Sequence, residues 1–203
     1  MPGRFFRIPY RRYAGASIAL ALLAAGCGVI VSNDDVTHQY LPQEVSTAGG
    51  SGNQIQVDVR GNPFAVPDRV LSEAVVSSMI GRVPGRRVDF ALEPQQVYTP
   101  RHWVVMLFDP PDGARARRLC QTAYEPAERP VNGVTDVKVL GAFCRRGFAL
   151  SWATGRAKDV SGPESPRFDQ LIAQMTKTLF PRINRNLEED VCDRFPERCP
   201  EDD

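Results

Sequence analysis

Carboxylates and one histidine are the first side chains in this 203-residue sequence that could carry acid–base chemistry. A pair of carboxylates can act as general acid and base on a glycan, and a histidine beside an acid can activate a nucleophile. His102 stands next to Trp103 at a predicted strand start, where we interpret it as an edge packing residue. The acids near predicted strand ends or polar faces are Asp58, Asp89, Glu93 and Asp109. Their spacing singles out no pair, so we assign no catalytic residue and expect no enzyme; a carboxylate-dependent hydrolase is the alternative.

Arginine could carry a second kind of chemistry, because a guanidinium fork suits phosphate and carboxylate groups. The sequence has 22 arginines and 3 lysines. Pairing with the protein's own acids is the plain interpretation, and anion binding is the alternative. A first local cluster comprises Arg82, Arg86 and Arg87, and the candidate anion-binding residues are Arg115, Arg117, Arg118, Arg145 and Arg146.

The N-terminal segment 1–26 has the layout of a secretory signal, with basic residues followed by an uncharged apolar run. The run from Ala14 to Ala25 is 12 residues long, whereas a membrane-spanning helix needs about 20. We therefore expect cleavage. An uncleaved signal anchor over the 18 residues 14–31 is the alternative.

The segment Leu23-Ala24-Ala25-Gly26-Cys27 resembles the lipobox of bacterial prolipoproteins, although Leu is commoner than Ala three residues before the cysteine. The resemblance implies cleavage before Cys27, a diacylglyceryl group on its sulfur and an amide-linked acyl chain such as palmitate. It also implies a partner, the lipid bilayer. Because Gly28 is not Asp, membership of this class implies an outer-membrane lipoprotein facing the periplasm, with an inner-membrane anchor as the alternative.

Cysteine parity agrees with this interpretation, because five cysteines are an odd number for a protein exported to an oxidising compartment. Setting Cys27 aside leaves four cysteines, which allow three pairings. The simplest joins Cys120 to Cys144 and Cys192 to Cys199. A thiol-active protein is the alternative. With no Cys-x-x-Cys and only two histidines, we expect neither a metal nor a cofactor.

Charge excludes one class of partner. The formal net charge of +1 gives no basic field for nucleic acid. Removal of residues 1–26 takes away four arginines and no acid, which leaves a net charge of −3. The last 16 residues, from Glu188 onward, hold eight acids and two arginines.

Composition divides the chain into four segments. We expect a cleaved signal at 1–26, a lipidated N-terminus and flexible tether at 27–53, one globular domain at 54–180, and an acidic, disulfide-looped tail at 181–203. Residues 32–53 of the tether are rich in Ser, Asn, Gln, Thr and Gly, and a flexible segment of these 22 residues would span about 25 Å.

Alternating apolar residues predict a strand at 55–59 and a hairpin over 137–154, and short strands are also predicted at 88–92 and 119–124. The uninterrupted apolar run at 103–108 is too short for a helix and predicts a central strand buried on both faces. Helical spacing predicts a helix from Pro67-Asp68 to Gly81, with Val70, Leu71, Ala74, Val75 and Met79 on its apolar stripe. A second helix runs from Ser165-Pro166 to Pro181. The order of these elements predicts an α+β fold, with an antiparallel-dominated sheet and two amphipathic helices packed on one face.

This arrangement, with the hairpin residues Leu150-Ser151-Trp152 and the closing Phe180-Pro181, is similar to small envelope lipoprotein domains of proteobacteria. That similarity implies an envelope protein and assigns no site. We expect a non-enzymatic binding or structural module whose partner is an envelope protein or an anionic envelope component. An envelope hydrolase is the alternative.

Overall fold

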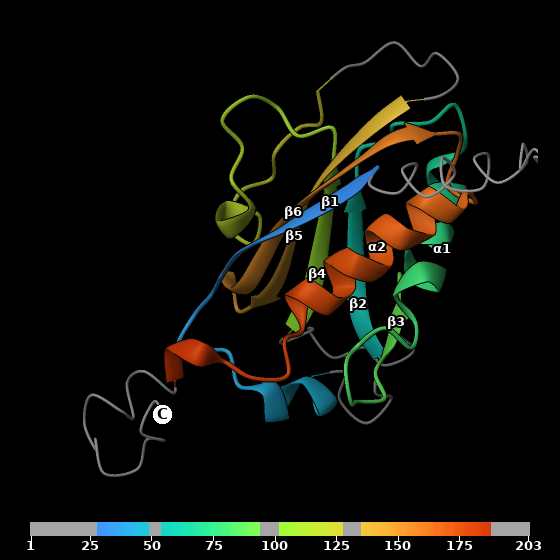
Figure 1. The fold of residues 1–203 in the computed structure, drawn as a ribbon. Helices are drawn as coiled ribbons and strands as arrows, with labels where there is room; N and C mark the ends of the chain where they lie inside the picture. The colour runs from blue at the N-terminus through green and yellow to red at the C-terminus, as the bar shows by residue number, and fades with distance from the viewer. Residues whose placement is uncertain (1–27, 49–53, 94–101, 128–134, 188–203) are drawn as a thin grey trace, which may run out of the picture.

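The structure is a computed structural model that describes residues 28–48, 54–93, 102–127 and 135–187. Its sheet has six strands in the order β1-β6-β5-β4-β2-β3 (Figure 1). Pairs β1–β6, β6–β5 and β5–β4 are antiparallel, and β2 runs parallel to both β4 and β3. The strands are β1 Val29–Val36, β2 Gln54–Arg60, β3 Asp89–Ala91, β4 His102–Phe108, β5 Thr135–Arg145 and β6 Phe148–Val160.

Two α-helices cover one face of this sheet, so the predicted α+β class, with its antiparallel-dominated sheet, is confirmed. The helices are α1 Asp68–Met79 and α2 Pro166–Leu179. The other face is covered by residues 109–127, which include the short 3₁₀ helix η3, Ala116–Arg118 (Figure 1). The centre of the sheet is therefore buried on both sides, and Val104 to Phe108 of β4 are fully buried, as predicted for a central strand.

Helix α2 packs closely on the sheet because two strand residues have no side chain. A Cβ at Gly141 would lie 2.8 Å from Met175, and a Cβ at Gly155 would lie 2.8 Å from the same side chain. The helix begins as predicted, with the Ser165 hydroxyl accepting from the Phe168 amide and Pro166 in the first turn.

The hairpin between β5 and β6 turns over only two residues. Arg146 and Gly147 have φ values of +50° and +84°, the left-handed conformation that a tight hairpin turn requires. This strand alternation was predicted, and Val137, Val139 and Phe143 lie in the core beneath the helices. Phe148 after the turn is 59% exposed.

The predicted tether at 27–53 is wrong in its first half. Residues Val29–Val36 form edge strand β1 against β6, and Pro42–Ser46 form a second 3₁₀ helix, η1. Val29 and Val31 pack against the core, while Ile30 is exposed. The 13-residue β6 offers a free edge, so a polar segment can gain ladder hydrogen bonds despite its weak hydrophobic pattern.

The predicted domain end at residue 180 is also wrong. The amide of Asn184 donates to the carbonyl oxygens of Thr37 and Tyr40, both at 2.8 Å. The described chain is therefore part of the domain beyond α2. The predicted 188–203 part of the tail, with Cys192 and Cys199, lies outside the described residues, as does Cys27.

The strand predicted at 119–124 is absent from the described residues of that segment. Ala116 and Leu119 are both buried at the three-residue spacing of a 3₁₀ turn, and the segment after Leu119 is a turn and irregular chain. Helix α1 also differs in detail, because Val70 from its predicted apolar stripe is 38% exposed.

Candidate functional site: an arginine-lined pocket

Three of the candidate acids, Asp58, Asp89 and Asp109, do not meet at one site. Asp58 lies opposite Val105 in the β2–β4 register, whereas Asp109 follows four residues further on, about 13 Å along the strand. The Asp58 carboxylate accepts from Nε and Nη2 of Arg60 at 2.9 and 2.6 Å. Asp89 lies on edge strand β3 opposite Gln54. Paired glycosidase carboxylates lie about 5 to 9.5 Å apart, so this arrangement does not resemble one.

The histidine and the predicted cysteine pair have structural surroundings. The His102 ring stacks on Phe143, with centroids 5.6 Å apart and an interplanar angle of 18°. Cys120 and Cys144 form a disulfide, with their Cα atoms 5.6 Å apart. The predicted pairing of these two cysteines is confirmed, although Cys120 lies in a turn and not in a strand. The bond leaves neither sulfur available as a nucleophile.

The five arginines selected from the sequence lie on two segments that this disulfide joins. Arg145 donates to Glu44 at 2.9 Å, and the Arg117 guanidinium lies 5.5 Å from the Trp152 ring centroid. These contacts are an ion pair and a cation–π contact within the protein. Arg115 and Arg118 belong to the η3 segment, and Arg146 is in the hairpin turn.

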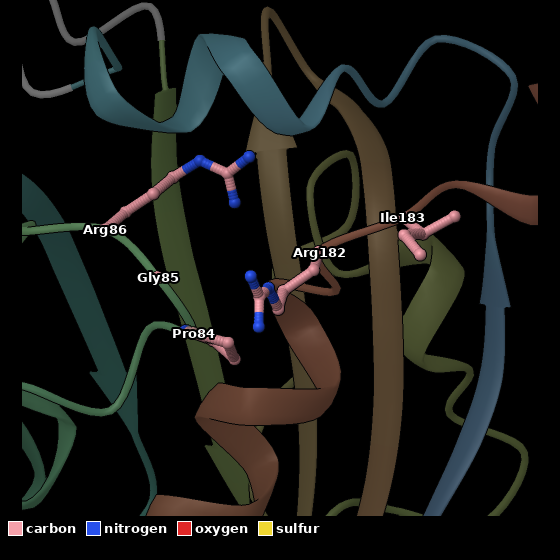
Figure 2. A pocket seen from close by; sticks show the side chains of 5 residues that line it. All are labelled: Pro84, Gly85, Arg86, Arg182 and Ile183. Carbon is pink, nitrogen blue, oxygen red and sulfur yellow. The ribbon is translucent and has the colours of Figure 1, made fainter.

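A pocket of about 410 Å³ lies at the end of the molecule where α2 stops. We call it the arginine pocket. Figure 2 shows the guanidinium groups of Arg86 and Arg182 directed into the same space from two different segments. The lining residues are Pro84, Gly85, Arg86, Arg182 and Ile183.

The position of Arg182 follows from how α2 ends. The Tyr40 hydroxyl donates to the carbonyl oxygen of Pro181 at 2.9 Å, and the buried Asn184 side chain bonds the 37–40 segment. Arg182 thus stands between two residues that are hydrogen-bonded to the same neighbouring segment. Just before it, the fully buried Phe180 packs against Phe143 and Phe90. These contacts fix the backbone from which the Arg182 side chain extends.

The position of Arg86 follows from the loop between α1 and β3. Val83 and Val88 are buried at either side of it, and Gly85 has a φ of +71°. This conformation favours glycine. The Arg182 side chain lies across Gly85, with Nε 3.6 Å from where a Cβ would be. The loop therefore holds Arg86 on one side of the pocket and passes beneath the second arginine.

Tyr40 connects the pocket to the core. Its ring is fully buried and contacts Phe143 edge-on at 6.3 Å. Burial raises the pKa of Tyr40 well above its ordinary value, and the positive charge of Arg86 lowers it by a smaller amount. Tyr40 therefore remains a neutral hydrogen-bond donor to Pro181 at physiological pH.

The pocket carries positive charge that the described residues do not neutralise. Each ion pair found among those residues involves other arginines, including the contacts of Arg82 with Asp169 and Arg145 with Glu44. Two unneutralised guanidinium groups facing one space favour a negatively charged ligand. The same described part of the chain contains no group of three His, Cys, Asp or Glu side chains placed to hold a metal ion.

The anion-binding residues selected from the sequence include neither arginine of this site. Arg86 belongs to the cluster with Arg82 and Arg87, but Arg182 lies almost a hundred residues later with no basic neighbour. The proline after α2 was the available signal, since it ends the helix and leaves the next side chain at the helix terminus.

Within the described residues, neither helix has the length and apolar character needed to cross a membrane. No family model and no curated protein sequence matches the chain. Among solved structures, the chain is similar to the PelC dodecamer from Paraburkholderia phytofirmans, with 16% identity and a TM-score of 0.41 over 76% of this chain and 99% of that one. A substituted PelC dodecamer from the same organism gives 14% identity and a TM-score of 0.40, with the same coverage. Likenesses at this level carry no argument about function.

Proposed function

We propose that this chain is a membrane-anchored envelope lipoprotein whose α+β domain is a non-enzymatic binding or structural module facing the periplasm. The single observation that carries the proposal is the sequence Leu23-Ala24-Ala25-Gly26-Cys27, at the end of an uncharged run that follows a basic start. Acylation of Cys27 on both sulfur and amino group would give more than the single chain that holds a protein only marginally.

The disulfide supports export. Stable structural disulfides form in oxidising compartments and are rare in the bacterial cytosol. Cys120 and Cys144 are bonded across the outer face of the sheet, where Cys144 is fully buried. This bond is consistent with a domain that folds after it has left the cytoplasm.

The start of β1 determines how such an anchor would hold the domain. The strand begins two residues after Cys27, and the Gly28 carbonyl already accepts from the Lys158 amide at 2.9 Å. A lipid on Cys27 would therefore hold this edge of the sheet directly against the bilayer, without the spacer of about 25 Å expected from a flexible tether. Lys158 and Arg167 lie at this end and could contact anionic headgroups.

A binding or structural role fits the side chains better than hydrolysis does. Asp58 is paired with Arg60, and the His102 ring is stacked on Phe143. The arginine pocket is lined by arginines and apolar groups. Such a lining can bind an anion but supplies no general base.

The experiment compares the parent with Cys27→Ser in a bacterial host grown with radiolabelled palmitate. We expect label and membrane fractionation for the parent, and loss of label in the variant. Cys192→Ser, the same chemical change at another cysteine, is the matched control and should keep the label. Equal labelling and identical fractionation of parent and Cys27→Ser would overturn the proposal. An intact N-terminus ahead of Cys27, found by mass spectrometry of the parent, would indicate a signal anchor instead.

Gly28→Asp tests which membrane retains the protein. We propose the outer membrane, so this change should shift the labelled protein toward the inner-membrane fraction. The fold should tolerate it, because a Cβ at this position would lie 3.4 Å from the Arg167 guanidinium, a favourable partner for a carboxylate. Inner-membrane fractionation of the unchanged parent would contradict the outer-membrane assignment while leaving lipidation intact.

A further inference from the structure

We propose that the arginine pocket binds an organic oxyanion, a molecule with one phosphate or carboxylate group and an apolar part. The site is formed by Arg86 and Arg182 above Gly85, with Pro84 and Ile183 as apolar walls. The proposal names a ligand class for the domain and does not depend on its lipidation.

Two positive charges converge on the pocket. The two guanidinium groups reach one space from segments almost a hundred residues apart in sequence, one in the α1–β3 loop and one after α2 (Figure 2). Holding two like charges together costs free energy, and an anion between them removes that cost. Each guanidinium offers several N–H donors in a planar fork, which matches the oxygens of phosphate or carboxylate.

The chain on either side of Arg182 is held by hydrogen bonds and by a buried ring. Before Arg182, the carbonyl oxygen of Pro181 accepts from the Tyr40 hydroxyl. After it, the side-chain amide of Asn184 donates to carbonyl oxygens in residues 37–40, and Phe180 is buried in an aromatic cluster. The Arg182 side chain also lies against Gly85, where a left-handed backbone disfavours any larger residue. The Arg182 side of the site is therefore held in place before a ligand arrives, which lowers the entropy lost on binding.

The size and the apolar walls of the pocket indicate a ligand larger than a single oxyanion group. Its volume of about 410 Å³ falls within the range of small-molecule sites, and is more than one oxyanion group fills. Ile183 is 59% exposed and Pro84 lies on the opposite loop, so apolar surface stands beside the charges. Burying this surface favours a ligand with an apolar part next to its anionic group.

The position of the pocket limits where the ligand comes from, and this step alone rests on the proposed anchor. Gly28 lies against Arg167 in the first turn of α2, whereas Arg182 follows the end of that helix. The 14 residues of α2 span about 21 Å. If Cys27 is anchored, the pocket is at the far end of the domain, open to ligands from the periplasm and away from the headgroups of the anchoring bilayer.

The test is calorimetric titration of the full-length protein in detergent with inorganic phosphate, phenyl phosphate and benzoate. We expect saturable binding of inorganic phosphate, and phenyl phosphate binding about five-fold more tightly because its ring contacts Pro84 and Ile183. Benzoate separates a carboxylate ligand from a phosphate ligand. Arg86→Gln and Arg182→Gln should each weaken binding about ten-fold or more, because each removes a charge-assisted hydrogen-bond donor.

Arg69→Gln is the matched control, since it makes the same charge change at an exposed arginine of α1 that is already paired with Glu73 at 2.7 Å. It should leave all three affinities unchanged. Ile183→Ala should reduce the advantage of phenyl phosphate over phosphate while preserving phosphate binding. Far-ultraviolet circular dichroism and thermal unfolding would establish that each variant is folded.

Three results would overturn the proposal: no saturable binding of any of the three anions, binding unaffected by both pocket variants, or an equal loss in Arg69→Gln. The titration is repeated with Cys27→Ser. If Cys27→Ser binds the anions and carries as much lipid label as the parent, the anchor proposal is rejected and the anion-binding proposal is retained. If the parent is lipidated through Cys27 but binds none of the anions, the anion-binding proposal is rejected and the anchor proposal is retained. Binding of phosphatidylglycerol vesicles by Cys27→Ser through Arg86 and Arg182, with no binding of free phosphate or phenyl phosphate, would reject a soluble ligand.

Discussion

The arginines on the two segments that the Cys120–Cys144 disulfide joins differ from those of the arginine pocket in what they contact. Arg117 lies over Trp152, and Arg145 is paired with Glu44. Arg86 and Arg182 instead face each other across a pocket, with no carboxylate partner among the described residues. Arg117 and Arg145, each with a basic neighbour in the sequence, are thus engaged by the protein itself, whereas two arginines that are distant in sequence converge. Charge density along a chain is a weak guide to a binding site unless the fold makes the charges converge.

The two regions also differ in what holds them. The outer-face segment is linked to β5 by the Cys120–Cys144 bond. The pocket is held by hydrogen bonds from Tyr40 and Asn184 and by the ring of Phe180. Covalent and non-covalent restraint can therefore be removed separately, and each removal should affect one region more than the other.

The largest effect is expected from the disulfide. The double change Cys120→Ala and Cys144→Ala should lower the free energy of unfolding by about 3 kcal/mol, because the crosslink closes a loop between cysteines 24 residues apart. Amide hydrogen exchange should increase most in residues 109–127 and little in residues 181–187. Chemical denaturation gives the first quantity and exchange mass spectrometry the second. Uniform exchange in both segments would mean that the regions are not separately held.

Removal of the Asn184 side chain should act on the opposite region. It is 4% exposed and donates to two carbonyl oxygens, so Asn184→Ala should cost about 2 kcal/mol and weaken phosphate binding. Asn62→Ala is the control, because that amide also bonds a carbonyl oxygen, of Val66 at 2.7 Å, but near α1. It should destabilise the protein without changing phosphate affinity. Unchanged affinity in Asn184→Ala would remove this side chain from the pocket's support.

The fold class could be predicted because strong local patterns coincide with the buried elements. The run from Trp103 to Phe108 is central strand β4, and Ser165-Pro166 begins α2. β1 could not be predicted, because its pairing is decided by the free edge of β6, more than a hundred residues away. The strand prediction at 119–124 is wrong because a short apolar pattern does not distinguish an extended strand from a 3₁₀ turn that covers a sheet.

The site was less predictable than the fold. The Cys120–Cys144 pairing followed from parity and proximity along the chain, and the disulfide agrees. Pro181 marks the end of α2 but does not single out Arg182, whose position comes from Tyr40 and Asn184 holding the segment after α2. Convergence of this kind depends on tertiary contacts between distant residues, which spacing and composition do not encode.

Alkaline pH offers a finer probe of the pocket's link to the core. The pKa of Tyr40 is raised in the folded state by burial, so the folded protein holds this proton more tightly than the unfolded chain. The contribution of protonated Tyr40 to the free energy of unfolding is fully present below the ordinary tyrosine pKa near 10. The free energy of unfolding should then fall as the pH rises from there toward the higher pKa that Tyr40 has in the folded state. Tyr40→Phe should remove that part of the alkaline loss, and cost about 1 kcal/mol near neutral pH through the lost bond to Pro181. Denaturation across alkaline pH, with tyrosinate absorbance, measures both. Equal alkaline loss in parent and variant would exclude Tyr40.

The smallest effect compares one arginine from each region. Arg145→Gln leaves Glu44 without its cation, and because both side chains are partly exposed the cost should be only about 0.5 kcal/mol. Arg86→Gln should have the opposite sign at low salt, slightly stabilising the ligand-free protein, since it removes a like charge facing Arg182. Added phosphate should reverse the order by stabilising the parent over Arg86→Gln, as binding to the folded state requires. Thermal unfolding at low salt, at high salt and with phosphate distinguishes these cases, because screening weakens both charge effects. A destabilised Arg86→Gln without phosphate would mean that this guanidinium is already satisfied by the protein, as Arg145 is.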